Sequence, residues 1–553
     1  MDSVKKISSI DELLDALRCN RNIIVYGYKL YGEELLEFLM NNYYNIRPSS
    51  YSGKIRCFAT SFDSYESRKG YAEVKGLPVK VISELQDYAE SDLVIVATKE
   101  EQHSAMLETL MKYGFKNIVA ITGICFYELQ SVNRLVSGQA RLEVMNYSLC
   151  HQNKLSSLRR KVANGHKVKV LFMTQRNTMF GCNSIYNIME QSALFEPCVL
   201  VFSKRDKLDE KWKVEVEEDF QKFKEQGYRV VSAYDEYGYP VDLDMYEPDI
   251  VFFDCPNLHA TSGMSHIRND RINWKYLTCY MPYGCLMANS FYYHYENINI
   301  RQAWKCFFDT KESYKKAISE AEFNASNAVL AGYPKLDDYK IDRKLNIPAK
   351  IDNGKKIVIY SPHWTIECNN RYSTFHKYYK YFLELVKSMP DVNFVFKPHP
   401  QLGHRIKLME EANQKIGISY EEYQEYIKEW AQLPNGYYCN DGDYIDLFKA
   451  SSCMITDCGS FIGEYLLSEN PCIYLLNPDN KEQMQGYTKT AKQILEQYYL
   501  CNSLEDIKKY VQRVIVDGTD DKKGNRLKIA NDEFVNIGNA GEFICRYLEE
   551  QLR

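Results

Sequence analysis

The 553-residue sequence has no long hydrophobic run, no closely spaced cysteine pair and no excess of basic residues. No stretch approaches the roughly 20 apolar residues that cross a bilayer, so we expect no membrane-spanning helix. The N-terminus MDSVKKISSI lacks the apolar core of a signal peptide, and the 17 cysteines form no CxxC pair. We therefore expect reduced thiols and a cytoplasmic protein. The formal net charge of −5 gives no general electrostatic attraction to nucleic acid, so no nucleic-acid partner is expected.

The motifs of common metal and cofactor sites are also missing. There is no HExxH motif and no paired Cys/His spacing, which argues against a metal site. The turn GYKLYG, which begins at Gly27, keeps two glycines but not the three of a dinucleotide fingerprint. We therefore expect no cofactor. Two interpretations of this turn stay open: a tight strand-to-helix connection, or a site for a small nucleotide or sugar-nucleotide.

Apolar runs alternate with helical patterns along the whole chain, which is typical of α/β folds with parallel sheets. The chain is too long for one core, because single domains stop growing near roughly 250–300 residues. We predict a Rossmann-like accessory domain over residues 1–130 and a helical connector over 131–165. Two further Rossmann-like lobes are predicted over 166–330 and 331–553.

Polar residues follow three apolar strands of the last lobe. The segments are IVIYSPHW (357–364), FVFKPHP (394–400) and SSCMITDCGS (451–460). Because the carboxyl ends of parallel strands meet at one edge of a sheet, we expect these residues to form one site. Four of them are predicted to bind nucleotide or phosphate: Ser361, His363, Thr456 and Asp457. For His363, a plain loop over a packed Trp364 is the alternative.

The segment TDCGSFIGEYLL predicts a helix that starts at Ser460. Ser460 is predicted as its N-cap, and the amides of Gly459 and Ser460 are expected to receive a phosphate. Glu464, one turn later, is predicted to hydrogen-bond a ribose hydroxyl. The alternative is an ordinary capped helix that packs on the sheet.

The segment FKPHP predicts a phosphate-binding lysine and a catalytic histidine. Lys397 supplies a point charge, and His399 stands between two prolines in a stiff turn after the strand. An imidazole there can hydrogen-bond phosphate or move a proton near neutral pH. A purely structural histidine is the alternative. In AGYPKLDDY (331–339), Asp337 and Asp338 are expected to shape the hinge between the lobes rather than to bind metal.

Taken in order, these segments resemble the CDP-glycerol glycerophosphotransferase family of teichoic-acid-type polymerases. That family has a GxPRxD-like hinge, an APTW-like segment, an HP histidine and an ITDYSS-like helix start. Here they correspond to Gly332–Asp337, Ser361–Trp364, His399 and Ile455–Ser460. The resemblance covers roughly the C-terminal 220 residues well, and the lobe from Val168 more loosely.

The resemblance implies a GT-B fold in which lobe 166–330 binds the acceptor and lobe 331–553 binds the CDP-linked donor. It implies transfer of a polyol phosphate, glycerol phosphate or similar, from a CDP-alditol to a hydroxyl, with release of CMP. The acceptor would be a cell-surface polysaccharide or its lipid-linked precursor. Peripheral association with the inner face of the cell membrane is compatible with that acceptor.

One departure from the family concerns the acceptor side. The family usually has a WHGTP-like segment whose histidine is the acceptor base, but CYMPYGCLMAN (279–289) has none. Three residues are predicted there instead: Tyr280, Tyr283 and Gly284. The base stays unassigned, with His259, His266 and His294 nearby in sequence.

Two other functions remain as alternatives. One is a GT-B glycosyltransferase that uses a CMP-sugar of the sialic acid or Kdo type, because its donor residues would be much the same. The other is an inactive nucleotide-binding scaffold, which the missing histidine favours.

Overall fold

The computed structural model divides into two compact units, Met1–Met145 and Asn146–Arg553. Both are α/β, and together they contain three sheets made almost entirely of parallel strands. The structure describes residues 4–18, 22–27, 30–40, 55–61, 73–74, 77–203, 208, 210–255, 267, 269–289, 294–295, 298–320, 325–366, 372–414, 416–440, 442–481 and 483–553.

The first unit is a seven-stranded sheet with the strand order β1-β7-β6-β2-β3-β5-β4. Only the short β4 is antiparallel to its neighbour. The strands are β1 (Lys5–Ile7), β2 (Ile23–Tyr26), β3 (Ile55–Thr60), β4 (Glu73–Val74), β5 (Leu77–Val81), β6 (Leu93–Val96) and β7 (Ile118–Ile121). The helices are α1 (Ile10–Arg18), α2 (Leu30–Met40) and α4 (His103–Lys112).

The two glycines of the β2–α2 turn are required by close packing. Gly27 has a φ of +117°, and a Cβ there would lie 2.4 Å from the carbonyl oxygen of Ala97. A Cβ on Gly32 would lie 2.0 Å from the carbonyl oxygen of Gly27. Neither position has room for a side chain, so the tight turn by itself explains both glycines.

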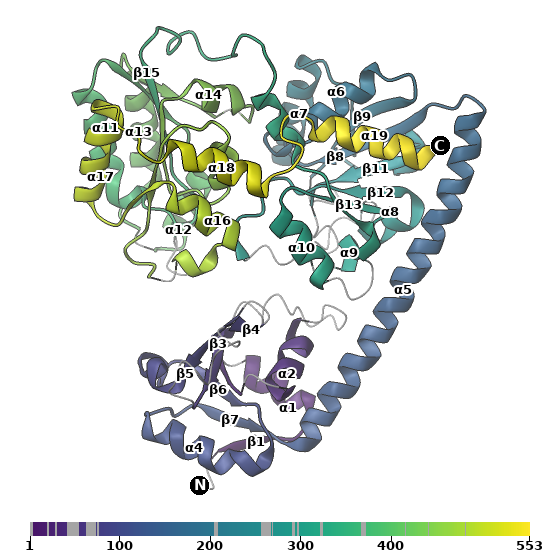
Figure 1. The fold of residues 1–553 in the computed structure, drawn as a ribbon, viewed down its shortest axis with the longest axis vertical. Coiled ribbons are helices and arrows are strands. Elements are labelled where there is room, and N and C mark those ends of the chain that lie inside the picture. The colour runs from purple at the N-terminus through teal and green to yellow at the C-terminus, as the bar shows by residue number, and fades with distance from the viewer. Residues whose placement is uncertain are drawn as a thin grey trace. The chain divides into compact units, whose positions relative to one another are not determined.

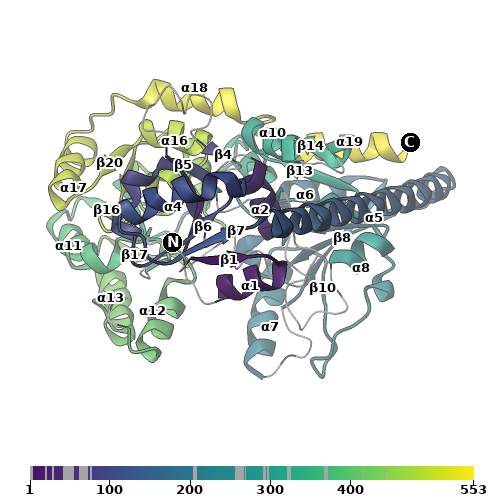
Figure 2. The same ribbon diagram turned by 90° about the horizontal axis from the view of Figure 1, so that it is seen from below.

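Helix α5 (Gly123–Ala163) is 41 residues long and uninterrupted (Figure 1 and Figure 2). It begins eight residues before the expected connector. Within the first unit, Phe126 stacks on Tyr31 with 3.7 Å between ring centroids. Within the second unit, His151 donates from Nε2 to the carbonyl oxygen of Asn273 at 2.7 Å.

The first lobe of the second unit is a parallel sheet with the order β10-β9-β8-β11-β12-β13-β14. Its strands are β8 (Val168–Thr174), β9 (Phe195–Val201), β10 (Val230–Ser232), β11 (Ile250–Phe253), β12 (Leu277–Tyr280), β13 (Lys305–Phe308) and β14 (Ala328–Leu330). Its helices are α6 (Asn183–Gln191), α7 (Glu210–Glu225), α8 (Asn269–Lys275), α9 (Ile298–Arg301) and α10 (Lys311–Glu320).

The second lobe is a parallel sheet with the order β17-β16-β15-β18-β19-β20. Its strands are β15 (Lys356–Ser361), β16 (Val392–Phe396), β17 (Gly436–Tyr438), β18 (Cys453–Thr456), β19 (Cys472–Leu475) and β20 (Tyr499–Cys501). The main helices are α11 (Phe375–Ser388), α12 (Leu402–Glu411), α13 (Tyr420–Gln432), α14 (Ile445–Ala450), α15 (Phe461–Leu466), α16 (Lys489–Glu496), α17 (Leu504–Tyr510), α18 (Lys523–Glu533) and α19 (Ala540–Leu552).

Strand order reverses in the second lobe between β15 and β18, which are neighbours although far apart in sequence. In open α/β sheets a ligand binds outside the carboxyl ends of the strands at this switch point. The three polar segments identified in the sequence follow β15, β16 and β18. The fold therefore delivers them to the edge where a ligand is expected.

The two lobes are joined by a buried carboxylate. Asp337, in the short 3₁₀ helix η8 (Pro334–Tyr339), accepts the backbone N–H groups of Ala540 and Gly541 at 2.8 Å and the Ser184 hydroxyl at 2.7 Å. Helix α19 thus returns from the second lobe to pack on α6 of the first (Figure 1). Asp338 accepts from the Asn183 amide at 2.9 Å, so both aspartates hold the hinge.

In the part of the chain that the structure describes, we find no helix with the length and apolar character needed to cross a bilayer.

Candidate functional site

The candidate site lies at the carboxyl ends of β15, β16 and β18. β15 runs between the other two strands, and Ser361 at its end is level with Thr456 at the end of β18. On the other side, Tyr360 is level with Phe396, which directly precedes Lys397. The structure therefore brings the three predicted segments together.

Two predicted binding residues lie beneath this site. Ser361 and Thr456 are 0% and 1% exposed. The Ser361 hydroxyl donates to the carbonyl oxygen of Lys397 at 2.5 Å, and the Thr456 hydroxyl donates to that of Ser361 at 2.6 Å. These bonds join the three strand ends, so in this structure the two hydroxyls support the site and do not face a ligand.

Asp457 is fully buried and holds two loops in place. Its Oδ1 accepts the backbone N–H of His363 at 2.5 Å. Its Oδ2 accepts both the backbone N–H and the hydroxyl of Thr374, the latter at 2.8 Å. Burial raises the pKa of Asp457 to about 7, although these hydrogen bonds act in the opposite direction. Contrary to the expectation of a phosphate contact, this carboxylate positions the segment that carries His363.

Two imidazoles lie side by side at the surface of the site. His363 and His399 are both partly exposed, and their ring centroids are 5.4 Å apart at an interplanar angle of 68°. The backbone N–H of His399 donates to the carbonyl oxygen of Pro362 at 3.0 Å, which joins their loops. Burial and the nearby Lys397 lower the pKa of His399 to about 3. Burial and His399 lower the pKa of His363 as well, so both rings are neutral at physiological pH.

A buried group of charges lies next to the imidazoles. The amines of Lys335 and Lys397 lie 4.0 and 4.8 Å from the ring centroid of Tyr444. The Tyr444 hydroxyl donates to Glu464, which is 2% exposed. Burial raises the pKa of Glu464, and the two lysines oppose that shift. The prediction that Glu464 meets a ribose hydroxyl is therefore not supported, because its carboxylate is buried and already paired.

Lys335 and Tyr444 were not identified as site residues from the sequence. Lys335 is 7% exposed and belongs to the hinge segment, and burial lowers the pKa of its amine while Glu464 opposes the shift. Its position in GYPKLDD, where the family has arginine, was the only available signal. Tyr444 carried none, because its contact with both lysines arises only in the folded lobe.

The start of α15 differs in detail from the prediction. Ser460 occupies the N-cap position, but its backbone is helical and its side chain makes no capping hydrogen bond. Its hydroxyl lies 3.1 Å from Sγ of Cys458 instead. Gly459 is partly exposed, and a Cβ there would lie 3.4 Å from the ring of Tyr487, an ordinary contact. The backbone conformation therefore does not require this glycine.

The predicted acceptor-side residues separate into a buried and an exposed group. Tyr280 is 0% exposed, and its hydroxyl is hydrogen-bonded to Nδ1 of His294, which is also buried. Burial lowers the pKa of His294 to about 3. Tyr283 and Gly284 are partly exposed, and a Cβ on Gly284 would lie 3.9 Å from Glu464. Tyr283 and Gly284 thus reach the second lobe, whereas Tyr280 belongs to the core of the first.

His259 and His266, the other two histidines named as candidate bases, lie outside the described residues. Among the described residues there is no group of three or more His, Cys, Asp or Glu side chains that could hold a metal ion.

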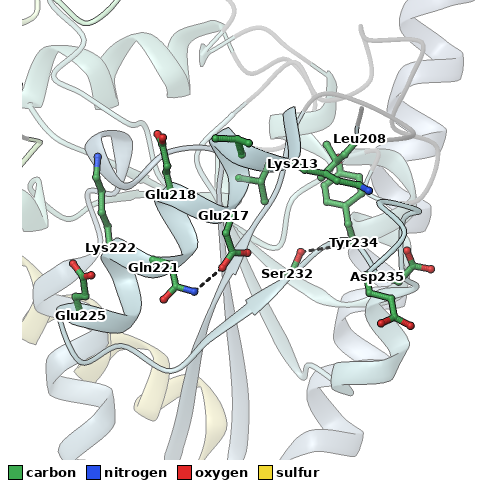
Figure 3. A pocket seen from close by; sticks show the side chains of 13 residues that line it. Leu208, Lys213, Glu217, Glu218, Gln221, Lys222, Glu225, Ser232, Tyr234 and Asp235 are labelled. Carbon is green, nitrogen blue, oxygen red and sulfur yellow. Dashed lines mark hydrogen bonds between the residues drawn. The ribbon is translucent and has the colours of Figure 1, made fainter. Parts of the chain in front are cut away.

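A groove lies away from the three strand ends, between α7 and β10 at the edge of the first lobe (Figure 3). Its volume is about 670 Å³, and its lining includes five carboxylates and two lysines. The carboxylates are Glu217, Glu218, Glu225, Asp235 and Glu236. This excess of negative charge repels a phosphate-containing ligand, so we do not place the donor there.

Comparison with known proteins supports the motif assignment. Residues 289–549 match the family model of the CDP-Glycerol:Poly(glycerophosphate) glycerophosphotransferases. This match confirms the resemblance found in the sequence, over those residues. No curated protein sequence matches the chain.

Several solved structures are similar at low identity. The wall teichoic acid polymerase TagF has 14% identity and a TM-score of 0.44, over 77% of this chain and 96% of that one. The UDP-GlcNAc 2-epimerase from Neisseria meningitidis has 14% identity and a TM-score of 0.45, over 70% of this chain and 100% of that one.

Proposed function

From the match of residues 289–549 to the CDP-glycerol:poly(glycerophosphate) glycerophosphotransferases, we propose that this chain is a glycerophosphotransferase of the CDP-glycerol type that acts on a cell-surface polymer. The family match is the observation that carries the proposal. The position of Lys397 and His399 at the switch point of the second sheet supports it.

In the proposed reaction, an acceptor hydroxyl oxygen attacks the phosphorus next to the alditol. A new P–O bond forms, the bond from that phosphorus to the bridging oxygen breaks, and CMP leaves with the bridging oxygen. The hydroxyl proton passes to a base that we leave unassigned. Phosphoryl transfer of this kind depends mainly on positioning and charge neutralisation.

We assign these two tasks to the donor lobe. Lys335 and Lys397 supply positive charge, and His399 supplies a hydrogen bond to the reacting phosphate. The amides of Gly459 and Ser460 supply further donors at the start of α15. Tyr283 and Gly284 form the acceptor side, because they are the partly exposed part of the opposing loop.

The finer features of the acceptor are part of the same proposal. We propose a lipid-linked precursor or the growing polymer as acceptor, with the protein bound peripherally at the inner face of the cell membrane. No cofactor takes part, since the CDP-linked donor is itself the substrate.

The test is to incubate purified protein with CDP-glycerol, CDP-ribitol or CMP-sugars and to measure CMP release with and without acceptor. Acceptor-dependent release from a CDP-alditol supports the proposal. Release from a CMP-sugar alone would identify a glycosyltransferase instead. A protein that binds CDP but releases CMP from none of these donors would be a scaffold.

We expect the first unit to be dispensable for donor binding. A chain that begins at Arg141 keeps the part of α5 that packs on the second unit, including His151, and all the strand-end motifs. It should bind CDP with the affinity of the full chain, as measured by calorimetry. A folded truncated chain that no longer binds CDP would show that the first unit contributes to the donor site.

We expect Gly459→Val to weaken CDP binding about tenfold or more, because a branched side chain would cover the amides at the start of α15. Ser460→Ala should change affinity less, since the amide remains and the hydroxyl does not cap the helix. Calorimetry with CDP measures both. Gly524→Val is the matched control, because a Cβ at that exposed glycine meets nothing within 4 Å. Unchanged affinity in Gly459→Val would place the nucleotide elsewhere.

A further inference from the structure

The backbone fixes which nitrogen of each site histidine carries the proton. Nδ1 of His363 lies 3.3 Å from the backbone N–H of Thr365, and Nδ1 of His399 lies 3.2 Å from that of Gln401. A backbone N–H can only donate, so in both rings Nδ1 must be the acceptor. Each neutral ring therefore carries its hydrogen on Nε2.

The two Nε2–H groups have no hydrogen-bond partner among the described residues. Neither Nε2 is among the buried polar atoms without a partner, and the hydrogen bonds of both rings to described residues involve Nδ1. Both rings are partly exposed, and they are 5.4 Å apart. Two hydrogen-bond donors thus stand side by side beyond the ends of β15 and β16.

The groups around the pair favour an anion and oppose a charged imidazole. Lys397 precedes His399 by two residues, and the Arg405 guanidinium of α12 lies 5.6 Å from the ring centroid of Trp364. Among the described residues, the Asp457 carboxyl is bonded to the loop of this pair, where it accepts the backbone N–H groups of His363 and Thr374. Among the described residues, the phenol ring of Tyr372 also packs against His363, and the ring of Tyr487 packs on Tyr372.

A second proton on either ring would have to go to Nδ1, where it would face a backbone N–H. This repulsion and burial keep both rings neutral, and Lys397 adds to the effect at His399, in agreement with the lowered pKa values of both rings. A neutral ring with its hydrogen on Nε2 has no lone pair there, so it is a donor and not a base.

We propose that His363 is a second oxyanion-binding residue of the donor site, and that His363 and His399 together hold the diphosphate of the donor through two neutral Nε2–H groups. The inference rests on the proposed function, because the CDP-linked donor supplies the diphosphate. It gives both histidines an electrostatic task, which is stabilising the oxyanion, and removes them from the candidates for the acceptor base.

The test compares His363→Ala with His363→Gln, because the glutamine amide can replace the Nε2–H donor but does not titrate. We expect His363→Ala to weaken CDP binding about tenfold or more, and His363→Gln to stay within about threefold of the unaltered chain. His404→Ala, an exposed histidine of the same lobe, is the control and should change nothing. Affinity for CDP-glycerol, whose phosphodiester groups do not titrate near neutrality, should vary less than about threefold between pH 6 and pH 8.

Three results would overturn the inference. Unchanged affinity in His363→Ala would remove His363 from the site. Equal losses in the alanine and glutamine variants would make its role one of packing. An affinity for CDP-glycerol that rises as the pH falls, and that is flat in His363→Gln, would mean a protonated ring. If the unaltered chain binds no CDP, the proposed function is wrong. The inference about the two histidines is then wrong as well, because it depends on that ligand.

Discussion

His399→Ala should lower the rate of transfer by about 10²–10³-fold while leaving the free energy of unfolding nearly unchanged. The imidazole is partly exposed at the end of a strand, so its removal leaves no cavity in the core. What is lost is a preorganised donor to the charge that develops on the transferring phosphate. The measurement is CMP release under single-turnover conditions, together with urea unfolding of both proteins.

Two comparisons make this expectation specific. His404→Ala removes an exposed imidazole five residues away and should leave the rate unchanged. His399→Gln keeps a side-chain N–H and should recover part of the rate lost in His399→Ala, because the neutral ring acts as a donor. An alanine variant with full activity would remove His399 from the catalytic site. One that unfolds readily would make the histidine structural.

Asp457→Ala should lower the free energy of unfolding by about 3–5 kcal/mol at pH 6. The carboxyl group accepts the backbone N–H of His363 and both the N–H and the hydroxyl of Thr374, and its removal leaves the two donors of fully buried Thr374 without this partner. The loop that carries His363 should loosen as well, so CDP affinity should also fall. Urea unfolding measures the first effect and calorimetry the second.

The stability difference between Asp457→Ala and the unaltered chain should depend on pH. Burial raises the pKa of Asp457 to about 7 in the folded state, above its unfolded value of about 3.9. The folded state therefore holds this proton more tightly, and the stability that it contributes is full below about pH 4 and is lost as the pH rises through 7. The difference should shrink between pH 5 and pH 8.

Asp352→Ala, which removes an exposed carboxyl of the same lobe, is the matched control for stability and should shift the free energy of unfolding by less than about 0.5 kcal/mol. If the loss of unfolding free energy in Asp457→Ala grows with pH, the three hydrogen bonds outweigh burial in setting the pKa of Asp457 and keep its carboxylate ionised.

Much of the site could be predicted because its parts follow buried strands. The apolar runs before Lys397, His399 and Gly459 predict strands by themselves, and parallel strands place their carboxyl ends at one edge of the sheet. The same reasoning predicted three parallel α/β sheets. The order of the motifs was sufficient to show the resemblance to the family whose model residues 289–549 match, since that order depends on residue types and spacing alone.

The division of roles among the site residues was not predictable in this way. Ser361, Asp457 and Glu464 have the composition of ligand-binding residues, but each is at most 2% exposed and bonded to the protein. Tyr280, the last residue of β12, is likewise fully buried, whereas Tyr283, three residues later, is partly exposed. Whether a polar side chain faces a ligand or supports the backbone depends on partners distant in sequence.

The sequence alone determined the α/β architecture, the edge of the sheet that carries the candidate site, and the resemblance to the family whose model residues 289–549 match, because local periodicity and motif spacing carry that information. Tertiary structure alone decided that Lys335 and Lys397 meet at Tyr444, and that Asp457 anchors the loop of His363. It also decided the protonated nitrogen of each imidazole, through backbone donors at Thr365 and Gln401. Burial, charge pairing and tautomer state arise from the three-dimensional surroundings of a side chain, and a linear pattern of residues does not specify those surroundings.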